Sequence, residues 1–435
     1  MNDVFRNYIL EEKILLENPI FLHLSLIAVF SILLLSTLRK SSAEKPLSIQ
    51  QTNQAKGLAI IIVIIHHICV FVLNDPTPLL PLCRIGFVGV SVFLILSGFG
   101  LAISLERNGV NQFFYKRFIR VYLPYVLATL LELGLRYSLL QQQPKLIDVA
   151  SLLGITNVDR TMWFIQFILF WYCILYLIYK LSFSQSIKIV ALFFVSLLLI
   201  ANPQVPDRNW YVNIFSFPVG YWLGLHAKSL TYQIGLLLNR RRPMIFLVVG
   251  LSFFSLAAFA YKEHILFSLS IYLIASLIIT LYLFQSTKRA VSIISLDSFL
   301  REEMNWFNFE TACFLFLIVI LYFGYFGLPL RPEFSKDVLY SIFAVFSGLG
   351  IVATISLLAK WNLYSQFLDF IGGISFELYL FHGMFMYTFD LILFRGNLAI
   401  TFFIYFGFIC LISILFQKLM ACLFKLIPPS WATRR

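Results

Sequence analysis

Residues 56–67 read KGLAIIIVIIHH and open the apolar stretch 57–74, which decides the fold class of this chain. An apolar run of this length is typical of a helix that crosses a bilayer. At about 100° per residue, Lys56 and His67 share one helix face and lie about 16 Å apart along the axis, while His66 falls about 80° to one side. An ionisable side chain inside a membrane helix is a functional-site hypothesis by default. The pair therefore predicts a polar path from one membrane surface toward His67.

The composition also indicates an integral membrane protein. Of the 435 residues, 60% are hydrophobic and 12% are charged, whereas soluble domains carry about 25% charged residues. Candidate spans lie at 20–38, 57–74, 85–105, 118–139, 163–180, 186–202, 211–228, 243–261, 265–285, 311–330, 338–359, 373–392 and 396–416. We therefore predict an all-α fold, a polytopic transmembrane helical bundle of about 12–13 spans.

The net charge of +12 is explained by orientation signals in loops, so we expect no nucleic-acid partner. If the loop 39–56 is cytoplasmic and the spans alternate, 22 of the 33 Lys and Arg residues are cytoplasmic. This bias predicts a multi-pass protein of the cell membrane with its N-terminus outside and its C-terminus in the cytoplasm. The first apolar run lacks a small-residue cleavage site and is expected to be a retained span. Residues 297–310 are expected to form an interfacial helix.

The cysteines do not predict a metal or disulfide site. All six stand singly, without a CxxC pair or a Cys/His ligand spacing. We therefore expect no metal site.

A pair of small residues marks the next apolar segment, which reads FVGVSVFLILSGF over 87–99. Small residues in a membrane helix allow a neighbouring backbone or a ligand to approach closely. Ser97 and Gly98 are expected near the depth of His67. Simple helix packing is the alternative interpretation.

A basic cluster opens the following span, which reads FFYKRFIRVYLPY over 113–125. In an α-helix, Lys116 and Arg117 lie four and three residues before Arg120, so the three cations share a face. They also stand at a helix N-terminus, where the backbone amides and the helix dipole favour anions. The cluster predicts a phosphate-bearing ligand, with membrane anchoring as the alternative.

Two later segments supply further candidates. Trp163 and Phe164 open a span at the expected outer surface, where an aromatic belt is the first interpretation. Near the C-terminus, Tyr379 lies three residues before His382, so its phenol could orient the imidazole. Glu377 is expected about one turn from the cytoplasmic mouth, where it can stay hydrated. A hydrogen-bonded structural histidine is the alternative for His382.

Together these segments resemble the bacterial acyltransferase 3 family of membrane O-acyltransferases, from about Asn53 to the last span. The family pattern of a basic residue, a glycine and a histidine is matched by Lys56, Gly57 and His67, although many members have arginine at the first position. The other matching residues are Ser97, Gly98 and Phe99; Arg117, Arg120 and Pro124; Trp163 and Phe164; and Ser375, Tyr379, Leu380 and His382. The expected organisation is an N-terminal extension with one extra span (1–52), an acyltransferase domain (53–420) and a cytoplasmic tail (421–435).

The resemblance implies that an acyl group, most often acetyl, moves from cytoplasmic acyl-CoA to a hydroxyl of a cell-envelope polysaccharide or lipid-linked glycan. No permanently bound cofactor is expected, and acetyl-CoA or another acyl-CoA is the donor substrate. His67 would act as general base or nucleophile, with Lys56 at the cytoplasmic mouth and Ser97 as a donor to the developing oxyanion. Lys116, Arg117 and Arg120 would bind the donor. The substrate path would be lined by Gly98, Trp163, Glu377, Tyr379 and His382.

A transporter or flippase of glycolipid or small anions is the alternative function, with the same histidines as proton relays. The order of the motifs and the basic cluster favour the acyltransferase. The partners expected for the acyltransferase are the lipid bilayer, acyl-CoA and the glycan acceptor, and the sequence leaves the oligomeric state open.

Overall fold

The computed structural model describes residues 14, 19–40, 47–74, 85–181, 183–202, 208–226, 334–360 and 363–426. The candidate spans at 243–261, 265–285 and 311–330, and the expected interfacial helix at 297–310, lie outside the described residues.

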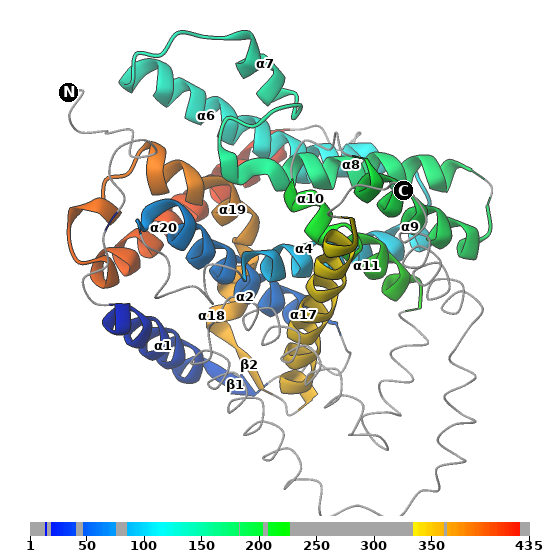
Figure 1. The fold of residues 1–435 in the computed structure, drawn as a ribbon, viewed down its shortest axis with the longest axis horizontal. Coiled ribbons are helices and arrows are strands. Elements are labelled where there is room, and N and C mark those ends of the chain that lie inside the picture. Colours follow the sequence, from blue (N-terminus) through cyan, green and yellow to red (C-terminus); the bar gives the residue numbers. More distant parts are fainter. Residues whose placement is uncertain are drawn as a thin grey trace, which may run out of the picture. The chain divides into compact units, whose positions relative to one another are not determined.

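The described part is almost entirely helical (Figure 1). Its α-helices are α1 (Pro19–Ser36), α2 (Ile49–His67), α4 (Gly86–Asn108), α5 (Phe113–Arg117), α6 (Leu123–Leu139), α7 (Leu146–Leu152), α8 (Trp163–Lys180), α9 (Gln185–Ala201), α10 (Arg208–Asn213), α11 (Ser216–Leu225), α17 (Phe334–Lys360), α18 (Gln366–Gly373), α19 (Ser375–Gly383) and α20 (Leu398–Leu426). Three π-helical segments are η1 (Ile68–Val72), η3 (Phe118–Tyr122) and η5 (Met384–Thr388), and two 3₁₀ turns are η4 (Arg160–Met162) and η6 (Leu393–Arg395). Two short strands, β1 (Leu38–Lys40) and β2 (Leu363–Ser365), pair antiparallel with Leu38 opposite Ser365.

The membrane character predicted from the sequence is confirmed. Among the described residues, five helical segments are long and apolar enough to cross a membrane: Ile49–Val72, Gly86–Asn108, Phe113–Leu139, Arg160–Lys180 and Leu398–Lys425. Shorter apolar helices lie at Leu24–Ser36, Gln185–Ala201 and Tyr340–Ser356. The total of about 12–13 spans stays a prediction, because some of the candidate spans lie outside the residues that the structure describes.

Two predicted spans are interrupted. The segment 211–228 divides into α10 and α11, and the Phe215 amide at the break donates to Ser341 Oγ at 3.2 Å. The segment 373–392 holds α19 and η5 and ends before Asp390, whose carboxylate accepts the Leu393 amide at 2.8 Å. In each case a side chain takes a backbone amide that a continuous helix would have paired internally.

The described residues belong to two compact units. The first consists of Met1–Val90, Gln112–Leu169 and Ile355–Arg435, and the second consists of Ser91–Asn111 and Phe170–Thr354.

In the first unit, α2 packs closely against α18 through two glycines. A methyl group on Gly57 would overlap the Leu368 carbonyl, and one on Gly372 would overlap the Asn53 carbonyl. The contact therefore needs backbone-to-backbone approach, as small residues provide in membrane helices. Gln54 extends it, because its side-chain oxygen accepts the Ser365 amide at 2.8 Å.

In the second unit, α4 packs against α11 by the same device. A methyl group on Gly98 would overlap the Phe217 carbonyl, and one on Gly220 would overlap the Ile95 carbonyl. Helix packing, the alternative interpretation of the sequence, therefore accounts for Gly98.

Candidate functional site

Two histidines from distant parts of the chain meet inside the first unit. His67 Nδ1 and His382 Nε2 lie 2.7 Å apart, and both side chains are buried, with exposed fractions of 8% and 0%. The ring planes differ by only 7° and the ring centroids are 5.0 Å apart. Parallel rings in face-to-face contact stay at about van der Waals separation, roughly 3.5 Å. The shorter N–N approach therefore indicates an edge-to-edge hydrogen bond between the imidazoles.

The backbone decides which nitrogen of His382 carries a proton. His382 Nδ1 lies 2.8 Å from the Tyr379 carbonyl and 3.2 Å from the Leu378 carbonyl. A carbonyl oxygen only accepts, so Nδ1 must be the donor and Nε2 of a neutral ring is the acceptor. His67 Nδ1 then donates to His382 Nε2. The remaining nitrogen, His67 Nε2, presents a lone pair that no group among the described residues engages.

Each histidine stands at the point where an α-helix changes to a π-helical turn. His67 is the last residue of α2 before η1, and His382 is followed by Gly383 and then η5. The two π-helical turns contact each other. Such turns are rare in proteins, and those that occur are frequently found at functional sites. Both helices therefore have an unusual backbone conformation where the two imidazoles meet.

The segment before α8 holds α19 in place. The Tyr379 hydroxyl donates to the Thr161 carbonyl and accepts the Phe164 amide at 3.2 Å. On the other side, the Tyr405 hydroxyl of α20 donates to the His382 carbonyl at 2.5 Å. Tyr379 therefore orients His382 through the backbone, and not through a direct bond between phenol and imidazole.

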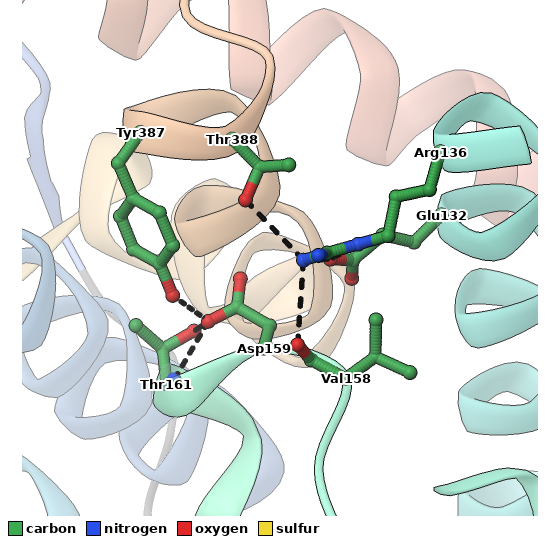
Figure 2. Close-up of polar contacts among 7 residues, drawn as sticks. All are labelled: Glu132, Arg136, Val158, Asp159, Thr161, Tyr387 and Thr388. Carbon is green, nitrogen blue, oxygen red and sulfur yellow. Dashed lines mark hydrogen bonds and ion pairs between the residues drawn. The ribbon is translucent and has the colours of Figure 1, made fainter. Parts of the chain in front are cut away.

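Figure 2 shows a buried polar cluster around Asp159. Asp159 Oδ1 accepts the Thr161 amide at 2.7 Å, the Thr161 hydroxyl at 2.9 Å and the Tyr387 hydroxyl. Asp159 is 1% exposed, and its other oxygen, Oδ2, has no hydrogen-bond partner in the part of the chain that the structure describes. A methyl group on Gly383 would overlap both Asp159 and Thr161. Glycine at this position lets the carboxylate reach the backbone next to His382.

The same cluster contains an ion pair within α6. Arg136 donates to Glu132 Oε1 at 2.5 Å from Nη2 and at 3.1 Å from Nε. Arg136 Nη2 also reaches the Val158 carbonyl at 3.3 Å and the Thr388 hydroxyl at 3.4 Å. Figure 2 shows the guanidinium beside Glu132, so the charge of Arg136 is directed to Glu132.

The structure places Lys56 and His67 on the single helix α2, as predicted. The helix begins at Ile49 with Ser48 as its cap, so Lys56 lies about two turns inside it and not at its first turn. This position is a correction to the expected helix mouth. His66 lies against Gly86, where a methyl group would overlap its ring. The His66 ring centroid lies 5.2 Å from that of His67, and the His67–His382 bond itself does not involve His66.

The basic cluster is not one regular α-helical face. Lys116 and Arg117 end α5, whereas Arg120 lies in the π-helical turn η3, so the expected spacing of three and four residues does not apply. Arg120 is exposed, and Lys116 and Arg117 are half-buried. Within the described residues, no hydrogen bond or ion pair joins this cluster to His67 or His382.

The other candidates have different surroundings. Trp163 and Phe164 begin α8 as predicted, but both are 7% exposed, so they pack inside the protein and do not form an outward-facing belt. Glu377 is half-buried in the first turn of α19. Ser97 is half-buried on α4 in the second unit. In the described part of the chain, His, Cys, Asp and Glu side chains do not gather in groups of three that could hold a metal ion.

The sequence interpretation did not single out Glu132, Arg136, Asp159 or Tyr387. A signal was present for two of them, because Glu132 and Arg136 are charged residues four apart in an apolar segment. Asp159 and Tyr387 had no comparable signal, since their importance comes from a contact across 228 residues.

Comparison with known families adds one finding. The family model described as an acyltransferase domain matches residues 49–300, more than half of the 435-residue chain. The match includes Lys56, His67, the basic cluster and Asp159, whereas His382 lies beyond it. No curated protein and no solved structure matches the chain.

Proposed function

Because this chain belongs to the acyltransferase 3 family, as its motifs predicted, we propose that it is a membrane O-acyltransferase with cytoplasmic acyl-CoA as donor. The proposed acceptor is a hydroxyl of a cell-envelope polysaccharide or lipid-linked glycan, and acetyl is the proposed acyl group. The family match and the apolar helices together indicate a multi-pass membrane protein with an acyltransferase domain. The N-terminus is proposed to lie outside and the C-terminus in the cytoplasm.

The observation that supports a catalytic role for His67 is its hydrogen bond to His382. With His67 Nδ1 donating, the Nε2 lone pair is available as a general base. The acceptor hydroxyl gives its proton to His67 Nε2 while its oxygen attacks the thioester carbonyl. The new C–O bond forms, the C–S bond breaks, and the departing CoA thiolate takes the proton from His67.

His382 supports this step without touching the substrate. When His67 takes up a proton, its Nδ1–H stays bonded to His382 Nε2, so the positive charge is shared with an oriented acceptor. The Leu378 and Tyr379 carbonyls keep His382 in the tautomer that this arrangement needs.

The donor is proposed to bind at the basic cluster of Lys116, Arg117 and Arg120, because the phosphates of acyl-CoA are anionic and need cationic partners. Lys56 is proposed to add positive charge along the path to His67. Ser97 is proposed to donate a hydrogen bond to the developing oxyanion. Trp163 and Glu377 are proposed to line the substrate path, whereas helix packing accounts for Gly98.

The first experiment compares the cell-envelope glycans of cells with and without the gene by mass spectrometry. A mass difference of one acyl group, absent with His67→Ala, is expected. His66→Ala is the matched control and should keep the product. A His67→Ala protein that inserts normally and keeps full acylation would overturn the assignment, and glycans without any acyl difference would favour the transport alternative.

A further inference from the structure

Among the residues that the structure describes, the buried carboxylate of Asp159 has no cation paired with it. Arg136, the neighbouring guanidinium, directs its hydrogen bonds to Glu132, Val158 and Thr388. Among the described residues, no lysine, arginine or histidine forms an ion pair with Asp159. A buried charge without a partner is costly, so its surroundings must explain why it is kept.

The hydrogen bonds around Asp159 are those of an ionised carboxylate. Three donors converge on Oδ1, from the Thr161 amide, the Thr161 hydroxyl and the Tyr387 hydroxyl. An ionised carboxylate accepts only, which suits three donors on one oxygen. Oδ2 has no donor and is buried. An ionised Asp159 adds one negative charge to the cluster beyond the Glu132–Arg136 pair.

The position of this charge relates it to the histidines. Asp159 contacts Gly383, the residue after His382, so closely that a methyl group there would overlap Oδ2 and Thr161 Oγ1. No hydrogen bond joins Asp159 to His382, because His382 Nδ1 is directed to backbone carbonyls and Nε2 to His67.

We propose that the Asp159 carboxylate is the fixed counter-charge for the proton that the His67–His382 pair takes up during acyl transfer. Before proton uptake, the pair is neutral and the carboxylate is unpaired. When His67 Nε2 takes the hydroxyl proton, the imidazolium forms in a low-dielectric interior, where a nearby opposite charge stabilises it strongly. Asp159 does not touch the reacting atoms and acts through His382, so it is a positioning residue. The inference rests on the proposed function.

Other titratable groups also surround the two sites. Those facing the histidine pair or Asp159 from the packed elements are His66, Glu132, Arg136, Tyr379, Tyr387 and Tyr405. The net charge of Glu132 and Arg136 together is zero when both are ionised. The tyrosines are neutral donors near pH 7. Asp390 is a further buried carboxylate and faces Tyr405. Asp159 is the carboxylate that contacts the residue next to His382, so its replacement tests the counter-charge most directly.

The test is the pH dependence of acyl transfer with Asp159→Asn in the full chain. Asparagine keeps an oxygen acceptor for Thr161 and Tyr387 and removes the charge. Membrane vesicles that carry the protein and the endogenous envelope glycan are given radiolabelled acetyl-CoA, and label in the glycan is measured from pH 5 to 9. The acid limb of kcat/KM reports the essential base of the free enzyme.

We expect the midpoint of the acid limb to move to lower pH by about one unit, because an imidazolium without its counter-charge loses its proton more easily. The maximal rate should fall about tenfold, because the interaction energy behind a pKa change of about one unit corresponds to about a tenfold change in rate. The KM for acetyl-CoA should not change. Asp148→Asn is the matched control, since Asp148 also accepts two hydrogen bonds, from Tyr137 and from the Lys145 amide, and it should leave the midpoint unchanged.

A slower Asp159→Asn enzyme with the native midpoint would show a purely structural role and would overturn the inference. If that variant is not recovered as a monodisperse protein, Tyr387→Phe and Asp159→Glu keep the negative charge and alter only the hydrogen bonds. In neither variant should the midpoint of the acid limb move to lower pH. Such a move in either one would contradict the proposed role of Asp159 as counter-charge. Full activity of His67→Ala would instead overturn the proposed function, so the two failures are distinguishable.

Discussion

His67 Nδ1 and His382 Nε2 are 2.7 Å apart although 315 residues separate them in the chain. Both imidazoles lie where an α-helix passes into a π-helical turn, and the two turns contact each other. The backbone carbonyls of α19 fix the proton on His382 Nδ1. This one bond leaves the lone pair on His67 Nε2, the proposed reactive nitrogen, with His382 as its proposed support.

Replacing His382 should reduce turnover and leave donor binding intact. His382→Ala removes the acceptor of the His67 Nδ1 proton, so the rate should fall about 100-fold, within the range that general-base catalysis contributes. The KM for acetyl-CoA should stay within about twofold, because the interaction is made in the transition state. His382→Gln, which offers a side-chain oxygen acceptor, should recover part of kcat. Equal rates for the alanine and native proteins would contradict the support role.

Adding a methyl group at the α2–α18 contact should destabilise the protein. Gly57→Ala and Gly372→Ala each place a carbon atom against a backbone carbonyl, and overpacking of this kind costs about 1–3 kcal/mol. The apparent Tm of the detergent-solubilised protein should fall. Gly373→Ala is the control next in sequence, because an added carbon there meets nothing within 4 Å. A Tm for Gly372→Ala equal to that of Gly373→Ala would refute the close contact.

Breaking the buried ion pair of α6 should cost more than removing it. Arg136→Met leaves Glu132, which is 0% exposed, without a cation, and the cost expected is about 3–5 kcal/mol. The double variant Glu132→Leu with Arg136→Met should recover most of this loss, since no buried charge remains. Unfolding followed in detergent measures all three proteins. Arg160→Met, at an exposed arginine, is the control and should change stability by under about 0.5 kcal/mol. Additive effects of the two changes would exclude a coupled pair.

Removing one exposed cation of the basic cluster should weaken donor binding. Arg120→Ala should raise the KM for acetyl-CoA about tenfold, equivalent to about 1.4 kcal/mol, with kcat unchanged. Acetyl-pantetheine lacks the nucleotide phosphates, so its KM should be the same for the native and variant proteins. Lys145→Ala, at another exposed basic residue, is the control. An Arg120→Ala protein that loses activity equally with both donors would show that Arg120 does not bind phosphate.

Part of this site could be predicted from the sequence because some of its chemistry is local. The apolar run around His67 makes an ionisable residue conspicuous, and helical spacing places Lys56 on the same helix. The spacing of Tyr379 and His382 also predicted that they are neighbours on α19, although the tyrosine acts through Thr161 and Phe164. The prediction of an aromatic belt at Trp163 was wrong, because this side chain is buried inside the protein. Aromatic residues are found both in protein interiors and at membrane surfaces, so residue type alone does not distinguish the two.

The sequence by itself determined a helical membrane protein and its family, and it marked His67 as the candidate catalytic residue and His382 as a candidate for the substrate path. Those conclusions depend on hydrophobicity, helical period and motif order, which are properties of short segments. Only the tertiary structure decided that His67 binds His382, that Asp159 contacts Gly383, and that Gly98 is a packing residue. Contacts between residues hundreds of positions apart depend on how helices cross and where π-helical turns redirect them, and no local pattern in the sequence records that geometry.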